Sequence, residues 1–258
     1  MAAKDSISKT LTVTVLLCVV CSVVVSAAAV LLKPQQVSNK ELDRKTNILA
    51  AAGLNEPGKS VDELFAQITT RIVDLETGTF TDAVNAATYD AAKAAKDPAL
   101  SIKLDRSADI ASIKRQARYM PVYLVQNGAQ IERIILPVHG YGLWSTLYGF
   151  LALEGDLNTV VGLGFYSHAE TPGLGGEVDN PAWKALWPGK QVYAEGSMEP
   201  LVHLIKGNVD PSSPDAAHQV DGLSGATLTS NGVSNLVKFW LGENGYAPFL
   251  ANLRAGGV

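Results

Sequence analysis

The longest apolar stretch of the chain lies near its N-terminus. Residues 11–32 are uncharged and mostly apolar. As a helix with a rise of about 1.5 Å per residue, this run would be about 33 Å long, which is enough to cross the hydrocarbon core of a membrane. The alternative is a cleaved signal peptide with its processing site at residues 26–29. The length of the run favours a retained transmembrane helix, preceded by a short tail at residues 1–10.

Residues 33–120 are predicted to form a linker and a mainly helical region. The linker is expected at residues 34–38, and a helical pattern follows at 39–54. Ser60 and Glu63 have the spacing of a capping box, which predicts the start of a second helix. The apolar residues of that helix would share one face; they are Val61, Leu64, Phe65, Ile68 and Ile72.

Residues 121–258 have a pattern that is typical of an α+β domain. Two apolar runs at 122–125 and 131–136 flank Asn127-Gly128, which predicts a β-hairpin in which Asn-Gly supplies the positive φ angles of the turn. Further strands are predicted at 147–153, 159–166, 191–194 and 201–206. Because these strands cluster and pair locally, we expect an antiparallel sheet with flanking helices.

Three loops contain more glycine and hydroxyl residues than a plain connection needs: the first loop (139–146), the second loop (167–176) and the third loop (221–230). Glycine lets a backbone approach a ligand closely. Apolar residues at helical spacing follow the third loop; they are Val233, Leu236, Val237, Trp240 and Leu241. The third loop therefore leads into a helix N-terminus, whose free N–H groups and positive dipole end suit a phosphate.

The third loop has other interpretations. A serine-hydrolase elbow is excluded, because that family places its histidine after the serine and the last histidine here is His218. Thr229 or Ser230 is expected to cap the helix, but a cap does not require the other hydroxyl residues of the loop. A phosphate cradle for a non-covalent nucleotide stays open, because composition alone does not separate it from a covalent site.

Charge and cysteine content narrow the possible functions. The net charge is −4 for 258 residues, and residues 1–45 carry +3, so the rest carries about −7. Such a domain lacks the basic surface that binds nucleic acid. Lysine residues flank the apolar run on both sides, so charge does not determine its orientation.

The cysteine and histidine residues do not predict a metal site. Cys18 and Cys21 are the only cysteines, and both lie in the apolar run, where we interpret them as small apolar fillers. The rest of the chain therefore has no disulfide framework, cysteine nucleophile or cysteine-ligated metal. Three histidines are too scattered for a metal site, and His168 is interpreted as a structural or rim residue.

The sequence of the third loop, DGLSGATLTS, resembles the signature of the covalent FMN-binding domain family. The segments 140–145 and 168–175 resemble the other motifs of that family. The whole chain is similar to the family of C subunits of sodium-translocating NADH:quinone oxidoreductases, which have one N-terminal membrane helix, a helical stretch and then this domain. In that family, the threonine that closes the Ser-Gly-Ala-Thr run carries FMN through a phosphoester bond. The corresponding residue here is Thr227.

The resemblance implies how the phosphate end of FMN is attached and held. A threonine hydroxyl without a neighbouring base is a weak nucleophile, so a separate flavin transferase would move FMN from FAD onto Thr227. Ser224 and the N–H groups near Gly225 and Ala226 would hold phosphate oxygens. Asp221 would serve recognition by the transferase, or it would cap a turn.

Flat apolar contact and a few polar groups are expected around the flavin ring. Leu174, with Gly175 beside it, would pack against one face of the ring. Glu170 and Thr171 would hydrogen-bond the ring or the ribityl chain. Trp144 would stack on the ring, or it would lie in the core of the domain.

The resemblance also implies a role in a larger enzyme. The chain would be a single-pass protein of the bacterial inner membrane whose domain faces the periplasm and passes electrons through FMN. Its partners would be the other membrane, flavin and iron–sulfur subunits, which would bind NADH and quinone, and the isolated chain would catalyse no net reaction. Two alternatives remain: the G-type subunit of an Rnf electron-transport complex, and a membrane-anchored assembly module without flavin, for which Thr227 would have no role.

Overall fold

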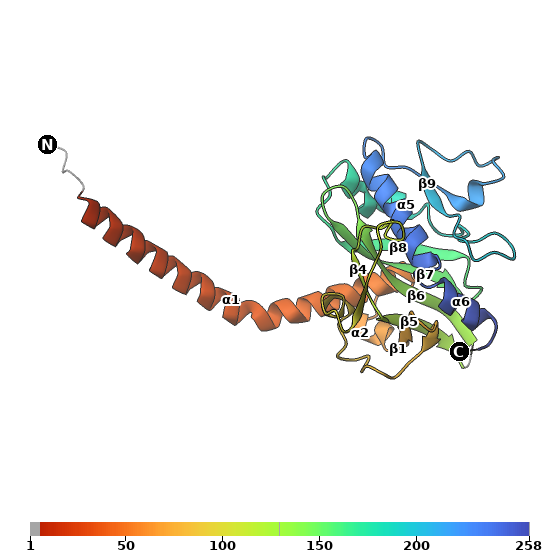
Figure 1. Ribbon diagram of the computed structural model, residues 1–258, viewed down its shortest axis with the longest axis horizontal. Coiled ribbons are helices and arrows are strands. Elements are labelled where there is room, and N and C mark those ends of the chain that lie inside the picture. The colour runs from red at the N-terminus through yellow and green to blue at the C-terminus, as the bar shows by residue number, and fades with distance from the viewer. Residues whose placement is uncertain (1–5, 129, 258) are drawn as a thin grey trace. The chain divides into compact units, whose positions relative to one another are not determined.

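The computed structural model describes residues 6–128 and 130–257 (Figure 1). The chain forms two compact units, Met1–Arg44 and Lys45–Val258. The second unit contains all the strands and the three loops singled out above, so the fold that positions a functional site is that of the second unit.

Helix α1 (Ile7–Ala51) contains the apolar run predicted at residues 11–32, and the side chains of this run are exposed. An 18-residue window of mean hydropathy 3.0 makes α1 long and apolar enough to span a membrane. The linker predicted at residues 34–38 is wrong, because α1 continues through Pro34. A proline removes one helical hydrogen bond, but the bonds on both sides of it can hold the helix together.

The prediction of a mainly helical region before residue 121 is also wrong. The capping box is confirmed: the Glu63 N–H donates to Ser60 Oγ (3.3 Å), and the Ser60 N–H donates to Glu63 Oε2 (2.8 Å). Helix α2 (Val61–Phe65) is short, however, and Ile68 and Ile72 belong to strand β1 (Ile68–Asp74). Residues four apart share a face in a helix and also in a strand, and the β-branched residues around them favour the strand.

Other short elements occupy the rest of this region, and the whole of residues 45–120 belongs to the same compact unit as the predicted domain. These elements are β2 (Thr79–Phe80), α3 (Ala91–Ala94), β3 (Ser101–Lys103) and β4 (Arg115–Ala117). Because β1 pairs with β5 in the central sheet, a domain boundary at residue 121 would cut through that sheet.

The central sheet has six antiparallel strands in the order β2-β1-β5-β6-β7-β8. Its long strands are β5 (Tyr119–Asn127), β6 (Gln130–Tyr141), β7 (Thr146–Glu154) and β8 (Val160–Ser167). The predicted hairpin joins β5 to β6, but Asn127 is paired with Gln130, so Asn127 is the last residue of β5 and not a turn residue as expected. Gly128, with φ 62°, supplies a positive φ angle there.

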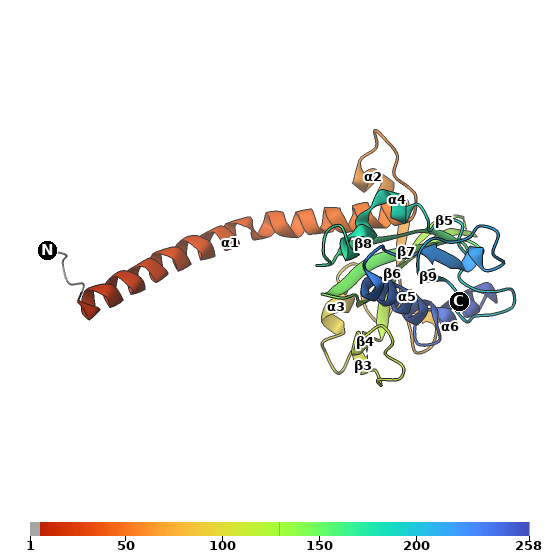
Figure 2. The same cartoon turned by 90° about the horizontal axis from the view of Figure 1, so that it is seen from above.

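Helices cover both faces of this sheet, which confirms the predicted α+β class (Figures 1 and 2). The last residues of α1 pack on one face, where Ile48 and Leu49 lie against Tyr123, Ile135 and Phe150. Helices α5 (Thr227–Leu241) and α6 (Ala247–Arg254) contribute to the core on the other face. All five apolar residues predicted on one side of α5 are buried.

Smaller elements connect β8 to α5. They are η1 (Gly175–Asp179), α4 (Pro181–Lys184), β9 (His203–Ile205), η2 (Ala216–His218) and β10 (Gln219–Asp221). Strands β9 and β10 form a separate parallel pair, which the expectation of a purely antiparallel domain does not include. The strand predicted at residues 191–194 is reduced to isolated bridges at Gln191 and Tyr193.

The buried face of α5 should dominate the stability of the second unit. Leu236 is fully buried, whereas Leu228 on the same helix is 59% exposed. We expect Leu236→Ala to lower the free energy of unfolding by about 2–5 kcal/mol, because it removes buried methyl groups and leaves a cavity. Leu228→Ala makes the same chemical change and should cost no more than about 0.5 kcal/mol. Equilibrium denaturation of the full chain in detergent measures both values, and equal losses would contradict this view of the core.

Candidate functional site

The N-terminus of α5 is open. Thr227 is the first helical residue, and Ala226 precedes it without a capping hydrogen bond from its side chain. The Ser230 N–H donates to Ala226 O, but the N–H groups of Thr227, Leu228 and Thr229 have no acceptor among the described residues. Thr227 itself is exposed. Unpaired N–H groups at the positive end of a helix dipole can bind an anion, so this end of α5 has the chemistry that was predicted for it.

The hydroxyl groups of the third loop have different surroundings. Thr229 and Ser230 are not helix caps, because both are buried inside the first turn of α5. Thr229 Oγ1 donates to Glu170 Oε2 (2.7 Å), and Ser230 Oγ accepts from the Leu223 N–H (2.9 Å). Ser224 is exposed, as is Thr227. Ser230 therefore holds the loop against the helix, and two hydroxyl groups remain on the surface.

Glu170 joins the three loops. Its side chain is only 5% exposed. Glu170 Oε1 accepts from the N–H groups of Leu143 (3.1 Å), Trp144 (3.0 Å) and Ser145 (3.3 Å), while Oε2 accepts from Thr229. The carboxylate in the second loop thus binds the first loop and the start of α5. Glu170 was expected to contact a flavin, but the structure turns it inward, where it supports the site from behind.

Two glycines make room for this carboxylate. A Cβ atom on Gly142 would lie 2.6 Å from Glu170 Oε1. A Cβ atom on Gly175 would lie 2.7 Å from Glu170 Oε2 and 2.5 Å from Thr229 Oγ1. These glycines therefore let the loops close around Glu170. From the sequence, the glycines of these loops were expected to let the backbone approach a ligand. Gly142 and Gly175 instead make room for the side chain of Glu170.

Two residues of this arrangement, Thr229 and Ser145, were not predicted as site residues. Thr229 was considered only as a cap, and Ser145 was not considered separately. Ser145 Oγ accepts from the Ala169 N–H (2.7 Å), which ties the first loop to the second a further time. Their presence in hydroxyl-rich loops was the available signal. Their partners could not be inferred, because 24 residues separate Ser145 from Ala169 and 59 separate Thr229 from Glu170.

Apolar side chains beside this end of α5 face solvent. Trp144 is 64% exposed, which excludes the alternative that it lies in the core. Leu174 is exposed too, and a Cβ atom on Gly225 would lie 3.0 Å from its Cδ2 atom, so the second and third loops meet there. Leu143 and Leu228 add further exposed apolar surface. We call Leu143, Trp144, Leu174 and Leu228 the apolar rim.

The remaining predicted residues lie close by. Asp221 ends β10, and its Oδ1 atom accepts from the Val209 N–H (2.8 Å), so it has a structural role in holding a neighbouring loop. The side chain of Thr171 is exposed in the second loop. Its carbonyl oxygen accepts from the N–H groups of Leu174 and Gly176, which shapes the turn that presents Leu174.

Known proteins resemble this chain over its whole length. Residues 142–242 match the profile of the FMN-binding domain family, and this range includes most of the three loops. The C subunit of the Na(+)-translocating NADH-quinone reductase of Pseudomonas aeruginosa is 60% identical, with 99% of each chain covered. The corresponding subunit of Vibrio vulnificus is 54% identical, with 100% of each chain covered.

The chain belongs to this family of C subunits. A solved structure of a family member, NqrC of Shewanella oneidensis, is 35% identical and has a TM-score of 0.75, covering 84% of this chain and 97% of that one. The C subunit from Parabacteroides distasonis is 26% identical, with a TM-score of 0.63 over 85% of this chain and 96% of that one. These structures confirm the fold expected for the family. The full-length sequence identity to the C subunits favours this family over the Rnf-type alternative.

The site fits the group that the family profile names. An FMN has an anionic phosphate and a flat, largely apolar ring. The open end of α5 offers N–H donors to the phosphate, and the apolar rim offers flat contact to the ring. Gly225, with φ 72°, lets the third loop turn next to Leu174 without a side chain in the way.

The histidines support the structure of the domain. His168 Nδ1 accepts from the Glu170 N–H (3.2 Å), and its Nε2 atom pairs with Asp179 Oδ2 (2.8 Å), so His168 positions Glu170. Burial lowers the pKa of His139 to about 4, with a smaller opposite effect from Asp109, so His139 is neutral at pH 7. The described residues contain no group of three or more His, Cys, Asp or Glu that could hold a metal ion.

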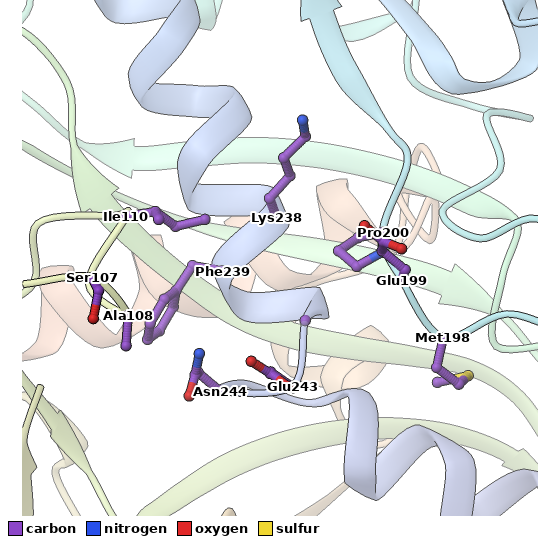
Figure 3. Close-up of a pocket in the computed structure, with 11 residues that line it drawn as sticks. Ser107, Ala108, Ile110, Met198, Glu199, Pro200, Lys238, Phe239, Glu243 and Asn244 are labelled. Carbon is purple, nitrogen blue, oxygen red and sulfur yellow. The ribbon is translucent and has the colours of Figure 1, made fainter. Parts of the chain in front are cut away.

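A separate cavity of about 750 Å³ lies at the other end of α5 (Figure 3). Lys238 and Phe239 from the last turn of the helix line it, together with segments around Ser107 and Pro200. Its lining mixes apolar side chains with charges of both signs, and it contains none of the predicted site residues. The candidate site is therefore the open N-terminus of α5 and not this cavity.

The hydrogen bonds to Glu170 should make stability depend on pH. Burial raises the pKa of Glu170, but the hydrogen bonds from Thr229 and from the N–H groups of residues 143–145 together bring it below its usual value. Such a carboxyl group stabilises the fold above its unfolded pKa of about 4.3, and this contribution is lost as the pH falls through the folded pKa. We therefore expect Glu170→Gln to cost about 1–3 kcal/mol at pH 7 and less at pH 3, because pH 3 lies below the unfolded pKa of about 4.3.

Denaturation of the full chain at both pH values measures this difference. Glu177→Gln is the matched control, because it removes a partly exposed carboxylate only seven residues away. We expect it to change stability little at either pH. An equal cost of Glu170→Gln at pH 7 and pH 3 would show that its charge does not stabilise the fold.

Proposed function

We propose that Thr227 carries FMN through a phosphoester bond, and that the chain passes electrons through this flavin within a Na+-translocating NADH-quinone reductase. One observation carries the proposal. The exposed hydroxyl of Thr227 lies at the uncapped N-terminus of α5, inside the range that matches the FMN-binding domain family. A phosphate on this oxygen would lie beside the unpaired N–H groups and the positive end of the helix dipole.

The surroundings of the other hydroxyl groups support Thr227 as the attachment residue. Thr229 and Ser230 are buried and already bonded to Glu170 and Leu223. Ser224 is exposed, but it lies in the loop before the helix, three residues from its first residue. We propose that Ser224, with the backbone at Gly225 and Ala226, contacts the phosphate.

Attachment requires a separate enzyme. No side-chain base is hydrogen-bonded to the Thr227 hydroxyl among the described residues, so self-attachment has no support. We propose that a flavin transferase catalyses attack of Thr227 Oγ1 on FAD. The new bond joins Thr227 Oγ1 to the flavin phosphate, the pyrophosphate bond of FAD breaks, AMP leaves, and the hydroxyl proton passes to a base of the transferase.

The apolar rim would position the ring once FMN is attached. Bound flavin supplies one- and two-electron redox chemistry. Trp144 and Leu174 would contact the ring and exclude water from it, with Gly175 fixing the backbone beside Leu174. The exposed hydroxyl of Thr171 is available to the ribityl chain or to the ring edge. Glu170 would keep the loops in place without touching the flavin.

We further propose that the chain works as a subunit anchored by α1 in the bacterial inner membrane, with its domain in the periplasm. The names of the relatives describe one subunit of a larger reductase, which supports other subunits of that complex as partners. We propose that these include membrane, flavin and iron–sulfur subunits. The described residues contain no doubly wound parallel sheet of the kind that binds dinucleotides. NADH and quinone would therefore bind elsewhere in the enzyme, and the isolated chain would not oxidise NADH.

Attachment is tested by the intact mass of the chain produced together with its flavin transferase. The wild-type chain should gain the mass of one FMN less one water, and the modified peptide should contain Thr227. Thr227→Ala should abolish the gain, while Ser224→Ala should keep it, because the second hydroxyl only contacts the phosphate. A full gain in Thr227→Ala would show that another residue carries the flavin.

Orientation is tested by labelling spheroplasts with a membrane-impermeant maleimide. The native cysteines lie in the apolar run, so the exposed surface of the domain offers none. Glu243→Cys places one on the exposed surface of the domain, and Lys9→Cys places one before the apolar run. We expect the first variant to be labelled in intact spheroplasts and the second only after lysis. The reverse pattern would place the domain in the cytoplasm.

A further inference from the structure

The charge of Glu170 has no cationic partner within residues 6–128 and 130–257. None of the ion pairs among the described residues involves it. Its four hydrogen-bond donors, three backbone N–H groups and the hydroxyl of Thr229, are all neutral. The imidazole of His168 accepts the Glu170 N–H with one ring nitrogen and pairs with Asp179 through the other. The dipoles of these N–H and O–H groups therefore stabilise the carboxylate, but its net charge of −1 is not neutralised.

Glu170 is ionised at neutral pH despite its burial. Its hydrogen bonds hold its pKa below the usual value, against the effect of burial. Thr229 is the third residue of α5, so the carboxylate also lies near the positive end of that helix. A buried charge is screened by solvent and salt much less than a surface charge, so its field reaches further into its surroundings.

The location of this charge is specific. The backbone of Trp144 contacts Glu170 Oε1, while the Trp144 side chain forms part of the apolar rim. On the other side, Thr229 contacts Oε2 and lies two residues after Thr227. The carboxylate therefore lies directly behind the surface that would hold the flavin, and it is linked by single hydrogen bonds to both ends of that surface.

We propose that Glu170 sets the reduction potential of the FMN on Thr227 by holding an uncompensated negative charge in the wall of its site. This inference rests on the proposed function. Reduction adds an electron to the flavin, supplied by the preceding redox carrier of the reductase. A fixed negative charge nearby disfavours that gain and lowers the potential. Glu170 is neither oxidised nor protonated in this step, and it does not touch the cofactor.

Glu170→Gln tests the proposal, because it removes the charge and keeps the shape. The amide oxygen can accept the N–H groups of residues 143–145, and the amide nitrogen can donate to Thr229 Oγ1. We expect the equilibrium constant for one-electron reduction to rise about tenfold, which is about 59 mV for a one-electron couple. The measurement is a redox titration, followed by flavin absorbance, of the full flavin-bearing chain in detergent.

Two control variants separate charge from packing. Thr229→Ser removes a buried methyl group but keeps both the hydroxyl that donates to the carboxylate and the charge of Glu170, so the potential should stay close to that of the wild type. Glu177→Gln removes a carboxylate from the same segment, but that side chain is partly exposed and screened by water. Its potential should also stay close to the wild-type value. The shift in Glu170→Gln should persist at high salt.

An unchanged potential in flavin-bearing Glu170→Gln would overturn the proposal, and so would an equal shift in Thr229→Ser. A wild-type chain without covalent flavin would instead overturn the proposed function, so the two failures are distinguishable. If Glu170→Gln does not fold, the wild-type chain labelled with 13C-glutamate replaces it. Its redox-difference infrared spectrum should show a carboxylate band that shifts when the flavin is reduced. Glu170→Asp should lack this band among the 13C-labelled signals, because the aspartate at position 170 carries no label. No such band would also overturn the proposal.

Discussion

The buried carboxylate of Glu170 is the interaction on which the geometry of the candidate site depends. It brings together the N–H groups of residues 143–145 and the hydroxyl of Thr229, which are otherwise far apart along the chain. A buried charge is costly unless it is well hydrogen-bonded, so the four donors must be in place together. This requirement explains why Gly142 and Gly175 have no side chains, since a Cβ atom at either position would collide with the carboxylate.

Helix α5 connects this site to the core. Its buried face packs on the sheet, and the Trp240 Nε1–H donates to the carbonyl oxygen of His139 (2.6 Å) in β6. Near its first residue, Thr229 donates to Glu170. The helix is therefore held at both ends. The orientation of the free N–H groups at Thr227 thus depends in part on the packing of Trp240, about 20 Å away along the helix. The contacts of α5 that stabilise the fold therefore also determine the geometry of the candidate site.

Local patterns predicted what depends on local physics. The apolar face of α5, the capping box at Ser60 and the hairpin after residue 121 follow from helical period, side-chain capping and turn chemistry. Ile68 and Ile72 were wrongly predicted to lie in a helix, because two residues four positions apart share one face in a helix and also in a strand. The composition of the three loops singled out segments that the structure brings together, but whether Glu170 faces inward and Trp144 outward depends on partners that lie more than 20 residues away.

The candidate site is exposed to solvent, which gives a physical reason for attaching a cofactor there covalently. Pockets that retain a free ligand usually bury most of its surface, whereas this site consists of a helix end and exposed side chains such as Trp144 and Leu174. Such a surface gives a non-covalent flavin few contacts. A phosphoester on Thr227 would retain the cofactor without enclosing it. The ring would then stay accessible to a partner that exchanges electrons with it, and the buried charge behind the loops could still act on it.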